Sequence, residues 1–480
     1  MIERIKELER LSASINPGFD ERREMLGKVI NYSDSFLENI SSLPSFVFTE
    51  DKGRDIYKSP IAEEGVPLDE LLNVIKNNVD TPGVNPASPG YLGYIPGGGI
   101  YYSALGDYLA DITNRYSGIF FLSPGAVRME NMLTAWMAGL AGYPDSAGGN
   151  LTSGGSIANL TAVVTARDYA GIEGAKVEKG VIYLSDHAHH SVDKAIRIAG
   201  LNSAVRRYLK TYDNFRIIPE ELERQILQDK KEGLIPFLII ASAGTTNTGS
   251  VDPLESIGDI AQKHSVWFHI DAAYGGFFLL SETGRKVLQG MDKSDSIVMD
   301  PHKGLFLPYG TGAIIIKDKM KMLNSHYFQA NYMQDSIDPE NELSPSDLSP
   351  EMSKHFRGLR LWLPLKIAGV KAFRTALEEK ILLAQYFHGS LSEIKNMEVG
   401  PFPDLSIVTY RYIPQKGDPN EFNKKLINEV QRDGRIFISS TMLNGKFVLR
   451  LVVLSFRTHL EQINTLIDVL KEKIKLLENN

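Results

Sequence analysis

Five short apolar runs in the middle of the chain constrain the fold more than any other feature. Each run is bounded by Gly, Pro, Asp or Ser, and helix-length segments lie between them. The runs cover residues 181–184, 237–240, 266–270, 296–299 and 313–316. Runs of this length and composition are typical of buried parallel strands with helices on both faces. The pattern predicts a doubly wound α/β sheet, in which chemistry lies at the carboxyl ends of the strands.

The segments on either side of this sheet differ in pattern and predict three parts. Residues 1–85 are helical, with a second amphipathic stretch at 25–43, and form a predicted dimerisation segment, because two or three short helices cannot bury their apolar faces alone. Residues 86–375 form the large α/β domain. Residues 376–480 form a small α+β domain, with strands at 406–413 and 447–454 and a final amphipathic helix. A homodimer is expected.

The composition excludes several classes of function. The chain of 480 residues has 52 Lys and Arg against 59 Asp and Glu, and lacks the basic surface expected of a nucleic-acid partner. Without any Cys it cannot form disulfides, thiolate metal sites, iron–sulfur clusters or a cysteine nucleophile. No apolar run reaches the ~18 residues of a membrane span, and no signal core is present. We therefore expect a cytoplasmic protein without a membrane partner.

Four features near the predicted strand ends carry candidate chemistry. The first is the Gly154–Gly155 turn before a helix at 156–169. Free backbone N–H groups at a helix start, with glycines and the Ser156 hydroxyl, can hold a phosphate. The alternative is an ordinary turn with a Ser cap. Dinucleotide and Walker glycine patterns are absent from the turn, so neither a dinucleotide nor a nucleoside triphosphate is indicated.

The second feature is Asp271, at the carboxyl end of a predicted strand. A carboxylate there could hold a positive nitrogen, a metal or a sugar hydroxyl, or could simply cap the next turn. With His269 it also matches half of a non-haem iron triad, but such triads usually lie in all-β barrels. We therefore expect no metal.

The third feature is Lys303, which follows another predicted strand in the run Asp300-Pro-His-Lys-Gly. Lysines beside such turns are mostly solvated surface charges. Between two apolar segments, however, Lys303 could be desolvated, which favours the uncharged amine that forms a Schiff base. It could then anchor an aldehyde cofactor.

The fourth feature is the cluster of His187, His189 and His190 after the strand at 181–184. Their spacing suits zinc poorly, because on extended backbone His190 points away from the other two. Stacking on an aromatic ring is a better use of one imidazole. Taken together, a phosphate turn, a stacking ring, a carboxylate and a lysine are the groups that pyridoxal phosphate requires.

These motifs resemble the pyridoxal-phosphate-dependent group II amino acid decarboxylases, which include aromatic L-amino acid decarboxylases. The resemblance runs from about residue 80 to 460. Its most specific segments are 152–160, 185–189, 243–246, 269–274, 300–303, 356–362 and 447–450. It implies the aspartate-aminotransferase fold (fold type I), with a mostly parallel central sheet, and a homodimer with a shared active site.

The resemblance also implies roles for individual residues. Lys303 would bind the cofactor aldehyde, Asp271 would hold the pyridine nitrogen, and His189 would stack on the ring. An ionised Asp271 would keep the ring cationic, so that it accepts the electrons of the broken carbon–carboxylate bond. The other expected cofactor-binding residues are Gly155, Ser156, Thr246, Ala273, His302 and Ser353.

By the same resemblance, Tyr94, Pro96, Tyr116 and Gly118 fall in the substrate pocket. Their aromatic content favours an aromatic L-amino acid, such as tryptophan, tyrosine, phenylalanine or dihydroxyphenylalanine. Gly118 stands where some relatives have a bulky aromatic residue, which would deepen the pocket. Packing of these tyrosines at a subunit interface is the alternative.

One segment departs from the family pattern. The long polar stretch 329–354 is an expected lid, and relatives have there a Tyr thought to protonate the substrate carbon, where this chain has Pro345. Tyr332, Tyr327 and His189 are the remaining candidate donors, and Tyr332 is assigned to the catalytic set. Without clean protonation, reaction with oxygen would give an aldehyde instead of an amine.

Other functions remain open on the same fold. They are an oxidative aldehyde synthase, a lyase of the sphingosine-phosphate type, an aminotransferase and a non-catalytic metabolite-binding protein. An aminotransferase would use an Arg such as Arg450 to hold the substrate carboxylate, but a buried structural Arg is the preferred interpretation. Asp271 and Lys303 argue against the binding protein, because a silent relative needs neither.

Overall fold

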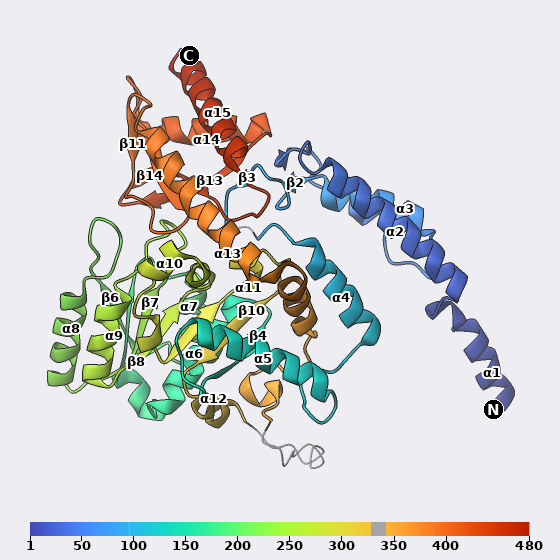
Figure 1. The fold of residues 1–480 in the computed structure, drawn as a ribbon, viewed down its shortest axis with the longest axis horizontal. Coiled ribbons are helices and arrows are strands. Elements are labelled where there is room, and N and C mark those ends of the chain that lie inside the picture. Colours follow the sequence, from blue (N-terminus) through green and yellow to red (C-terminus); the bar gives the residue numbers. More distant parts are fainter. Residues whose placement is uncertain (96, 328–341, 480) are drawn as a thin grey trace.

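The computed structural model of the chain describes residues 1–95, 97–327 and 342–479. Figure 1 shows an N-terminal helical arm, a central α/β part and a C-terminal α+β part. The central part is built on a sheet of seven strands within these residues, in the order β4-β10-β9-β8-β7-β5-β6. Its strands are β4 Gly148–Thr152, β5 Gly180–Ser185, β6 Val205–Leu209, β7 Ile235–Ser242, β8 Trp267–Asp271, β9 Ser296–Met299 and β10 Gly312–Ile316.

The five predicted strands are all confirmed, and the sheet is buried on both faces. Neighbouring residues of one strand, such as Ile297 and Val298, lie in two separate apolar clusters. Strands β5, β6, β7, β8 and β9 pair in parallel. Helices pack on the sheet: α5 Pro124–Leu140, α6 Gly155–Tyr169, α7 His190–Ile198, α8 Pro219–Lys231, α9 Leu254–His264 and α12 Lys319–His326. Helix α10 Glu282–Val287 contacts the segment 276–280 that follows β8. The doubly wound, mostly parallel α/β fold is therefore confirmed.

The direction predicted for one strand is wrong. Strand β10 is antiparallel to both of its neighbours, β9 and β4. A parallel return usually uses a full helix as its crossover. Between β9 and β10 the chain has only the four-residue helix α11 Pro301–Gly304 and a loop. The chain therefore turns back at the edge of the sheet where β9 ends.

The C-terminal part is a second sheet, with the order β11-β12-β14-β13-β3. Strand β3, Tyr91–Leu92, precedes the strands of the central sheet in the sequence and pairs in parallel with β13. The other strands and helices are β11 Met397–Val399, β12 Ile407–Tyr412, β13 Phe437–Leu443, β14 Lys446–Val452, α14 Pro419–Asp433 and α15 Leu460–Glu478. The predicted strands at 406–413 and 447–454 and the final helix are thus confirmed.

Helix α13, Arg357–Leu391, runs through the predicted domain boundary at residue 375 and connects the two sheets. It bends at Gly369, whose φ of 71° and ψ of 152° are not helical. Because glycine has no Cβ, it adopts this conformation at low cost. The boundary is therefore a bent helix, and the proposed division into domains stays a prediction at this point.

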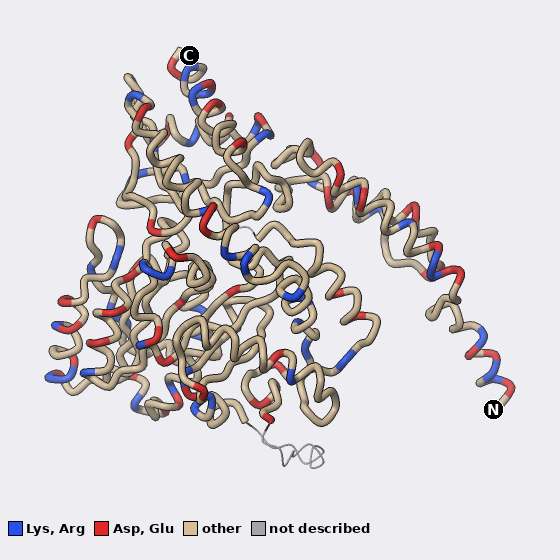
Figure 2. Tube along the Cα trace, in the orientation of Figure 1, with Lys and Arg blue, Asp and Glu red and all other residues tan. Residues whose placement is uncertain are grey.

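The N-terminal arm begins with α1 Ile2–Leu11 and α2 Phe19–Asn39, followed by α3 Leu68–Ile75 and α4 Tyr101–Thr113. A small ribbon of β1 Phe46–Val47 and β2 Gly83–Val84 lies between them. Helices α1 and α2 bury none of their residues in the chain and extend away from its body. Figure 2 shows acidic and basic residues interspersed along both helices.

Among the described residues, no helix is both long and apolar enough to cross a membrane. The cytoplasmic location inferred from the sequence stays a prediction.

Candidate active site

A cavity of about 530 Å³ opens where the parallel strands of the central sheet end. Strands β5, β7, β8 and β9 are each followed by residues that line it, because the carboxyl ends of parallel strands meet at one edge of the sheet. The segment before the antiparallel strand β10 reaches the same edge and adds Tyr309 and Gly310. The predicted cofactor residues that line this cavity are Gly155, Ser156, His189, Thr246, Asp271, Ala273, His302 and Lys303.

The turn from β4 into α6 forms one wall of the cavity. Gly154 has a φ of +154°, a backbone conformation that residues other than glycine rarely adopt. A Cβ at Gly155 would lie 3.0 Å from Asp300 Oδ2 and 3.3 Å from the Ala273 Cβ. Helix α6 starts directly after the turn, so its first N–H groups have no intrahelical acceptor. The turn can therefore hold an anion such as phosphate.

Asp271 is the last residue of β8, and its side chain is held from two directions. One carboxylate oxygen accepts a hydrogen bond from Asn159 Nδ2 at 3.0 Å, and the other accepts one from the Ala273 N–H at 3.2 Å. Only 8% of the residue is exposed, in the cavity wall. This carboxylate is placed to pair with a positive group inside the cavity.

Lys303 lies on the short helix α11 after β9, and its Nζ is 3.1 Å from Asp300 Oδ2. Asp300 is 1% exposed. Its second oxygen, Oδ1, is buried without a hydrogen-bond partner among the described residues. A buried carboxylate oxygen without a donor is costly, so the cavity is built to receive a further polar group.

Two histidines face this group of charges, and burial lowers the pKa of both. For His189 the nearby Asp271 carboxylate opposes the effect of burial, and for His302 the Asp300 carboxylate does so. His189 Nδ1 is 2.7 Å from Ser191 Oγ, and His302 Nδ1 is 2.5 Å from the Thr311 carbonyl oxygen. Both imidazoles are thus held in the neutral form within the cavity wall.

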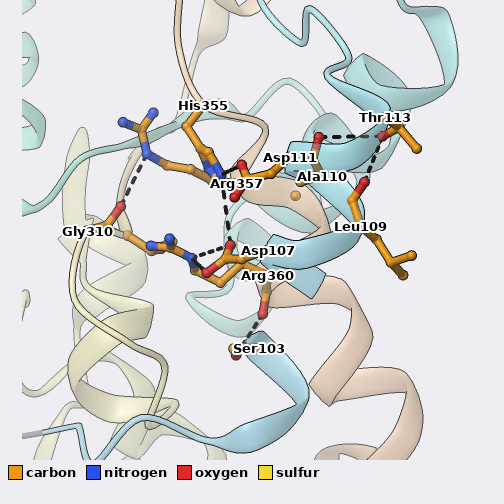
Figure 3. A network of polar contacts seen from close by, with 12 residues as sticks. Ser103, Asp107, Leu109, Ala110, Asp111, Thr113, Gly310, His355, Arg357 and Arg360 are labelled. Atoms are coloured by element: carbon orange, nitrogen blue, oxygen red, sulfur yellow. Dashed lines mark hydrogen bonds and ion pairs between the residues drawn. The ribbon is translucent and has the colours of Figure 1, made fainter. Parts of the chain in front are cut away.

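A polar network connects the start of α13 with α4 and with the cavity-lining segment at residues 309–310 (Figure 3). Arg360 Nε donates to both carboxylate oxygens of Asp107 on α4, at 2.7 and 2.8 Å. The same guanidinium reaches the Tyr309 carbonyl at 2.9 Å and Thr311 Oγ1 at 3.2 Å. Arg357 Nε donates to the Gly310 carbonyl at 3.2 Å. The start of α13 therefore fixes the 309–311 segment, which carries the acceptor of His302.

Hydrogen bonds to other parts of the protein hold the side chain of Arg450 in the C-terminal sheet. Its Nη1 donates to the Thr246 carbonyl at 2.6 Å, its Nε donates to Ser439 Oγ at 3.0 Å, and it is 4% exposed. These contacts brace a cavity-lining loop, and Arg450 itself does not line the cavity. The arrangement agrees with the structural interpretation and leaves the aminotransferase role without support.

Sequence reasoning missed several residues of the wall. Asp300 begins the run that contains Lys303, but the sequence did not predict a role for it. The other missed residues that line the cavity include Asn159, Ser191, Ser242 and Tyr274. Asn159 had a detectable signal, because it is the one amide among the apolar positions of α6 that face the sheet. The contacts of the other residues depend on strand order, which the sequence does not show.

Some predicted site residues lie elsewhere in the chain. Ser353 and the substrate-pocket residues Tyr94, Tyr116 and Gly118 do not line this cavity. Tyr116 Oη lies 3.4 Å from Ser353 Oγ, so two of them form one group. A Cβ at Gly118 would lie 2.5 Å from the Met352 carbonyl oxygen. Pro96 and Tyr332 are outside the described residues.

His269, considered as an iron ligand, lies inside the sheet and contacts Ser296 and Asn159. In the part of the chain that the structure describes, no group of three or more His, Asp and Glu side chains could hold a metal ion.

Residues 55–413 match the pyridoxal-dependent decarboxylase conserved domain. The chain belongs to this decarboxylase family. An aromatic-L-amino-acid decarboxylase of Bacillus atrophaeus is 34% identical over 97% of this chain and 98% of its own length. A phenylacetaldehyde synthase of Arabidopsis thaliana is 29% identical over 80% of this chain and 82% of its own.

The fold is also that of solved decarboxylases. The crystal structure of Oryza sativa TDC with PLP and tryptamine superposes with a TM-score of 0.90, at 24% identity, over 96% of this chain and 99% of that one. The likeness establishes fold type I. The expected family and the pyridoxal-phosphate-dependent carboxy-lyase activity on an amino acid are therefore confirmed.

The cavity of this decarboxylase fits pyridoxal phosphate. The helix start at Gly155 and Ser156 suits its phosphate, Asp271 suits its ring nitrogen, and Lys303 suits its aldehyde. The bound cofactor supplies a cationic ring that accepts the electron pair of the bond to the lost carboxylate.

Proposed function

We propose that this decarboxylase converts an aromatic L-amino acid to its amine and carbon dioxide. The observation that carries the proposal is the meeting of Asp271, Lys303 and His189 in one cavity beside the start of α6. The similarity to an aromatic-L-amino-acid decarboxylase along nearly the full length of both chains supports an aromatic substrate. No specific observation favours the lyase of the sphingosine-phosphate type.

Each of the three residues has a proposed task. Asp271 pairs with the protonated ring nitrogen of the cofactor and keeps the ring cationic, since a nearby negative charge favours the protonated form. Lys303 would hold the cofactor through its amine. His189 would lie against the ring, where it could carry a proton to the substrate carbon after carbon dioxide leaves. Tyr332 is the alternative donor.

We further propose a homodimer with a shared active site. The apolar residues of α1 and α2, such as Ile5 and Leu8 at 55% and 49% exposure, have no partner surface within the described chain. Exposed apolar faces of this size are usually buried in an interface. The Tyr116–Ser353 group lies outside its own chain's cavity, and we assign it to the partner's site.

The dimer is tested by light scattering after size-exclusion chromatography. The full chain should have twice the mass of one protomer, and a variant with Ile5→Asp and Leu8→Asp should shift toward monomer. A full chain that is monomeric at micromolar concentration contradicts the shared site.

The reaction is tested by incubating the cofactor-loaded protein with single L-amino acids under air and analysing products by mass spectrometry. We expect amine and carbon dioxide from an aromatic amino acid, and neither product from a Lys303→Ala variant. If only non-aromatic amino acids lose their carboxylate, the aromatic proposal is wrong. If none does, phosphorylated amino alcohols become the next substrates to test.

An oxidative aldehyde synthase is the second candidate. Pro345 occupies the position where relatives have the lid Tyr, and it begins a buried 3-10 turn, Pro345–Leu348. No hydroxyl is available at that position for proton donation. One of the relatives is a phenylacetaldehyde synthase. In the same experiment, oxygen uptake with aldehyde, ammonia and hydrogen peroxide as products would favour this candidate over the amine.

A further inference from the structure

A continuous chain of buried polar groups runs beneath the cavity. It begins with Trp267 Nε1, which donates to Ser296 Oγ at 2.9 Å. Ser296 Oγ is 2.8 Å from His269 Nδ1, and His269 Nε2 is 2.9 Å from Asn159 Oδ1. At Asn159 the chain divides into two branches. Each of these four residues is less than 4% exposed, so the groups satisfy one another without solvent.

The two branches end at the two residues that would contact the cofactor ring. Asn159 Nδ2 donates to Asp271 Oδ2 at 3.0 Å in one branch and to Ser191 Oγ at 3.1 Å in the other. Ser191 Oγ is in turn 2.7 Å from His189 Nδ1. A single amide therefore contacts the carboxylate directly and the imidazole through one hydroxyl.

In each hydrogen bond of this polar network, it is fixed which group donates and which accepts. A carboxylate accepts and does not donate, so the NH₂ group of Asn159 must face Asp271 and its oxygen must face His269. Burial lowers the pKa of His269 to about 4, so the ring is neutral and has one proton. That proton lies on Nε2, because Asn159 Oδ1 can only accept. Nδ1 of His269 then accepts from the Ser296 hydroxyl.

The same reasoning fixes the proton of His189. Ser191 Oγ already accepts from Asn159, so its own hydrogen is free to point to His189 Nδ1. The backbone N–H of Ser191 also donates to this nitrogen, at 3.2 Å. With two donors at Nδ1, the proton of the neutral ring lies on Nε2. Among the described residues, Nε2 of His189 has no hydrogen-bond partner, and the ring lines the cavity.

We infer that Asn159 is a positioning residue that orients the Asp271 carboxylate and, through Ser191, holds the His189 proton on the nitrogen that is free in the cavity. The inference rests on the roles proposed above for Asp271 and His189. It adds that one side chain of α6 sets the geometry of both, so the two roles are coupled.

The first test needs neither the cofactor nor a substrate. In cofactor-free protein labelled with ¹⁵N-histidine, long-range proton–nitrogen correlation shows which ring nitrogen is protonated. His189 and His269 are assigned from His189→Gln and His269→Gln variants. We expect both to have the proton on Nε2. A proton on Nδ1 of His269 would overturn the inference, whatever the substrate of the enzyme proves to be.

The second test separates the two branches. Asn159→Ala should weaken pyridoxal phosphate binding roughly tenfold to a hundredfold, as expected for loss of a hydrogen bond to a charged group. It should also shift the pH titration of the cofactor's visible absorbance by about one unit, because Asp271 loses its orientation. Ser191→Ala should alter the ¹⁵N signals of His189, but should change the affinity and the absorbance titration less than Asn159→Ala does, because the contact of Asn159 with Asp271 remains.

Asn423→Ala is the matched control, because Asn423 is a buried amide that donates to the Tyr412 carbonyl in the C-terminal part, far from the cavity. If Asn159→Ala does not fold, Asn159→Ser keeps a small polar side chain and still loses the contact with Asp271. Asn159 variants that match the Asn423 control in cofactor affinity and absorbance titration would refute the positioning role. So would a Ser191→Ala variant that moves the absorbance as far as Asn159→Ala does.

Discussion

Lys303 Nζ lies 3.1 Å from Asp300 Oδ2, so the amine that would bind the cofactor is paired with a buried carboxylate. The same carboxylate lies against the turn at Gly155 that would hold the phosphate. A negative charge at this place attracts the lysine side chain and repels the phosphate. Asp300 therefore balances two parts of one cofactor site.

This balance makes a prediction for Asp300→Asn. The amide keeps the shape of the side chain but removes its charge, so the cofactor-free protein should bind inorganic phosphate more tightly, by about tenfold or ~1.4 kcal/mol. Calorimetric titration with phosphate measures the change. Asp295→Asn, before the opposite end of β9, should have no effect. Equal or weaker phosphate binding by Asp300→Asn would show that the carboxylate does not face the anion.

The buried pair of Lys354 and Glu130 makes a prediction about stability. Lys354 Nζ is 2.6 Å from Glu130 Oε2, and the two side chains are 0% and 2% exposed. Lys354→Met should lower the free energy of unfolding by about 3 to 5 kcal/mol, because it leaves a buried charge without a partner. Urea unfolding at one fixed protein concentration measures this loss.

The second substitution in this pair serves as its control. Adding Glu130→Gln to Lys354→Met removes the unpaired charge, and glutamine can still accept from the Gly358 N–H, which lies 3.1 Å from Glu130 Oε1. Most of the lost stability should return. A single variant that loses less than about 1 kcal/mol would mean that solvent reaches the pair.

The network in Figure 3 predicts that Arg360 supports cofactor binding from a distance. Arg360→Met removes the contacts to Asp107, Tyr309 and Thr311 together, so the segment that carries the acceptor of His302 loses its support. We expect cofactor affinity to fall roughly tenfold, as for the loss of a charged hydrogen bond. Equilibrium dialysis against pyridoxal phosphate measures it. Arg374→Met, further along α13, should retain the original affinity.

A pH effect is expected from Asp433. Hydrogen bonds from Arg435 hold the pKa of this carboxyl at about 2, below its usual value, with Lys473 adding to the effect. Because the folded-state pKa is lowered, the stabilisation is complete above about pH 4 and is lost as the pH falls toward 2. Asp433→Asn should therefore be less stable than the original chain at pH 6, and the difference should shrink below pH 4.

Urea unfolding of both proteins between pH 6 and pH 3 measures this difference. Glu429→Gln on the same helix is the control. A difference that stays constant as the pH falls to 3 would rule out Asp433 as its source.

The sequence predicted the central sheet because its strands are buried on both faces and are therefore continuously apolar. It did not predict β4, whose residues 148–150 are Gly, Gly and Asn, or β6, an edge strand with Arg206 and Arg207. The direction of β10 was wrong because apolar runs contain no information about direction. The connection from β9 lacks a helix-length periodic segment, and this would have argued against a parallel return.

For the site, the residues at strand ends were predictable one by one, since strand ends meet at one edge. Lys303, Asp271 and His189 were found in this way. The role of Asn159 was not predictable, because it depends on contacts with His269 and Asp271, more than a hundred residues away. Such pairs are created by the order of the strands.

The most direct test of the account is to locate the cofactor on the chain. The loaded protein is reduced with borohydride, digested and analysed by mass spectrometry, with Lys303→Ala treated in the same way. We expect a phosphopyridoxyl group on the peptide that contains Lys303, and no such group anywhere in the variant. A phosphopyridoxyl group on another lysine of the original protein, with Lys303 unmodified, would contradict the proposed site.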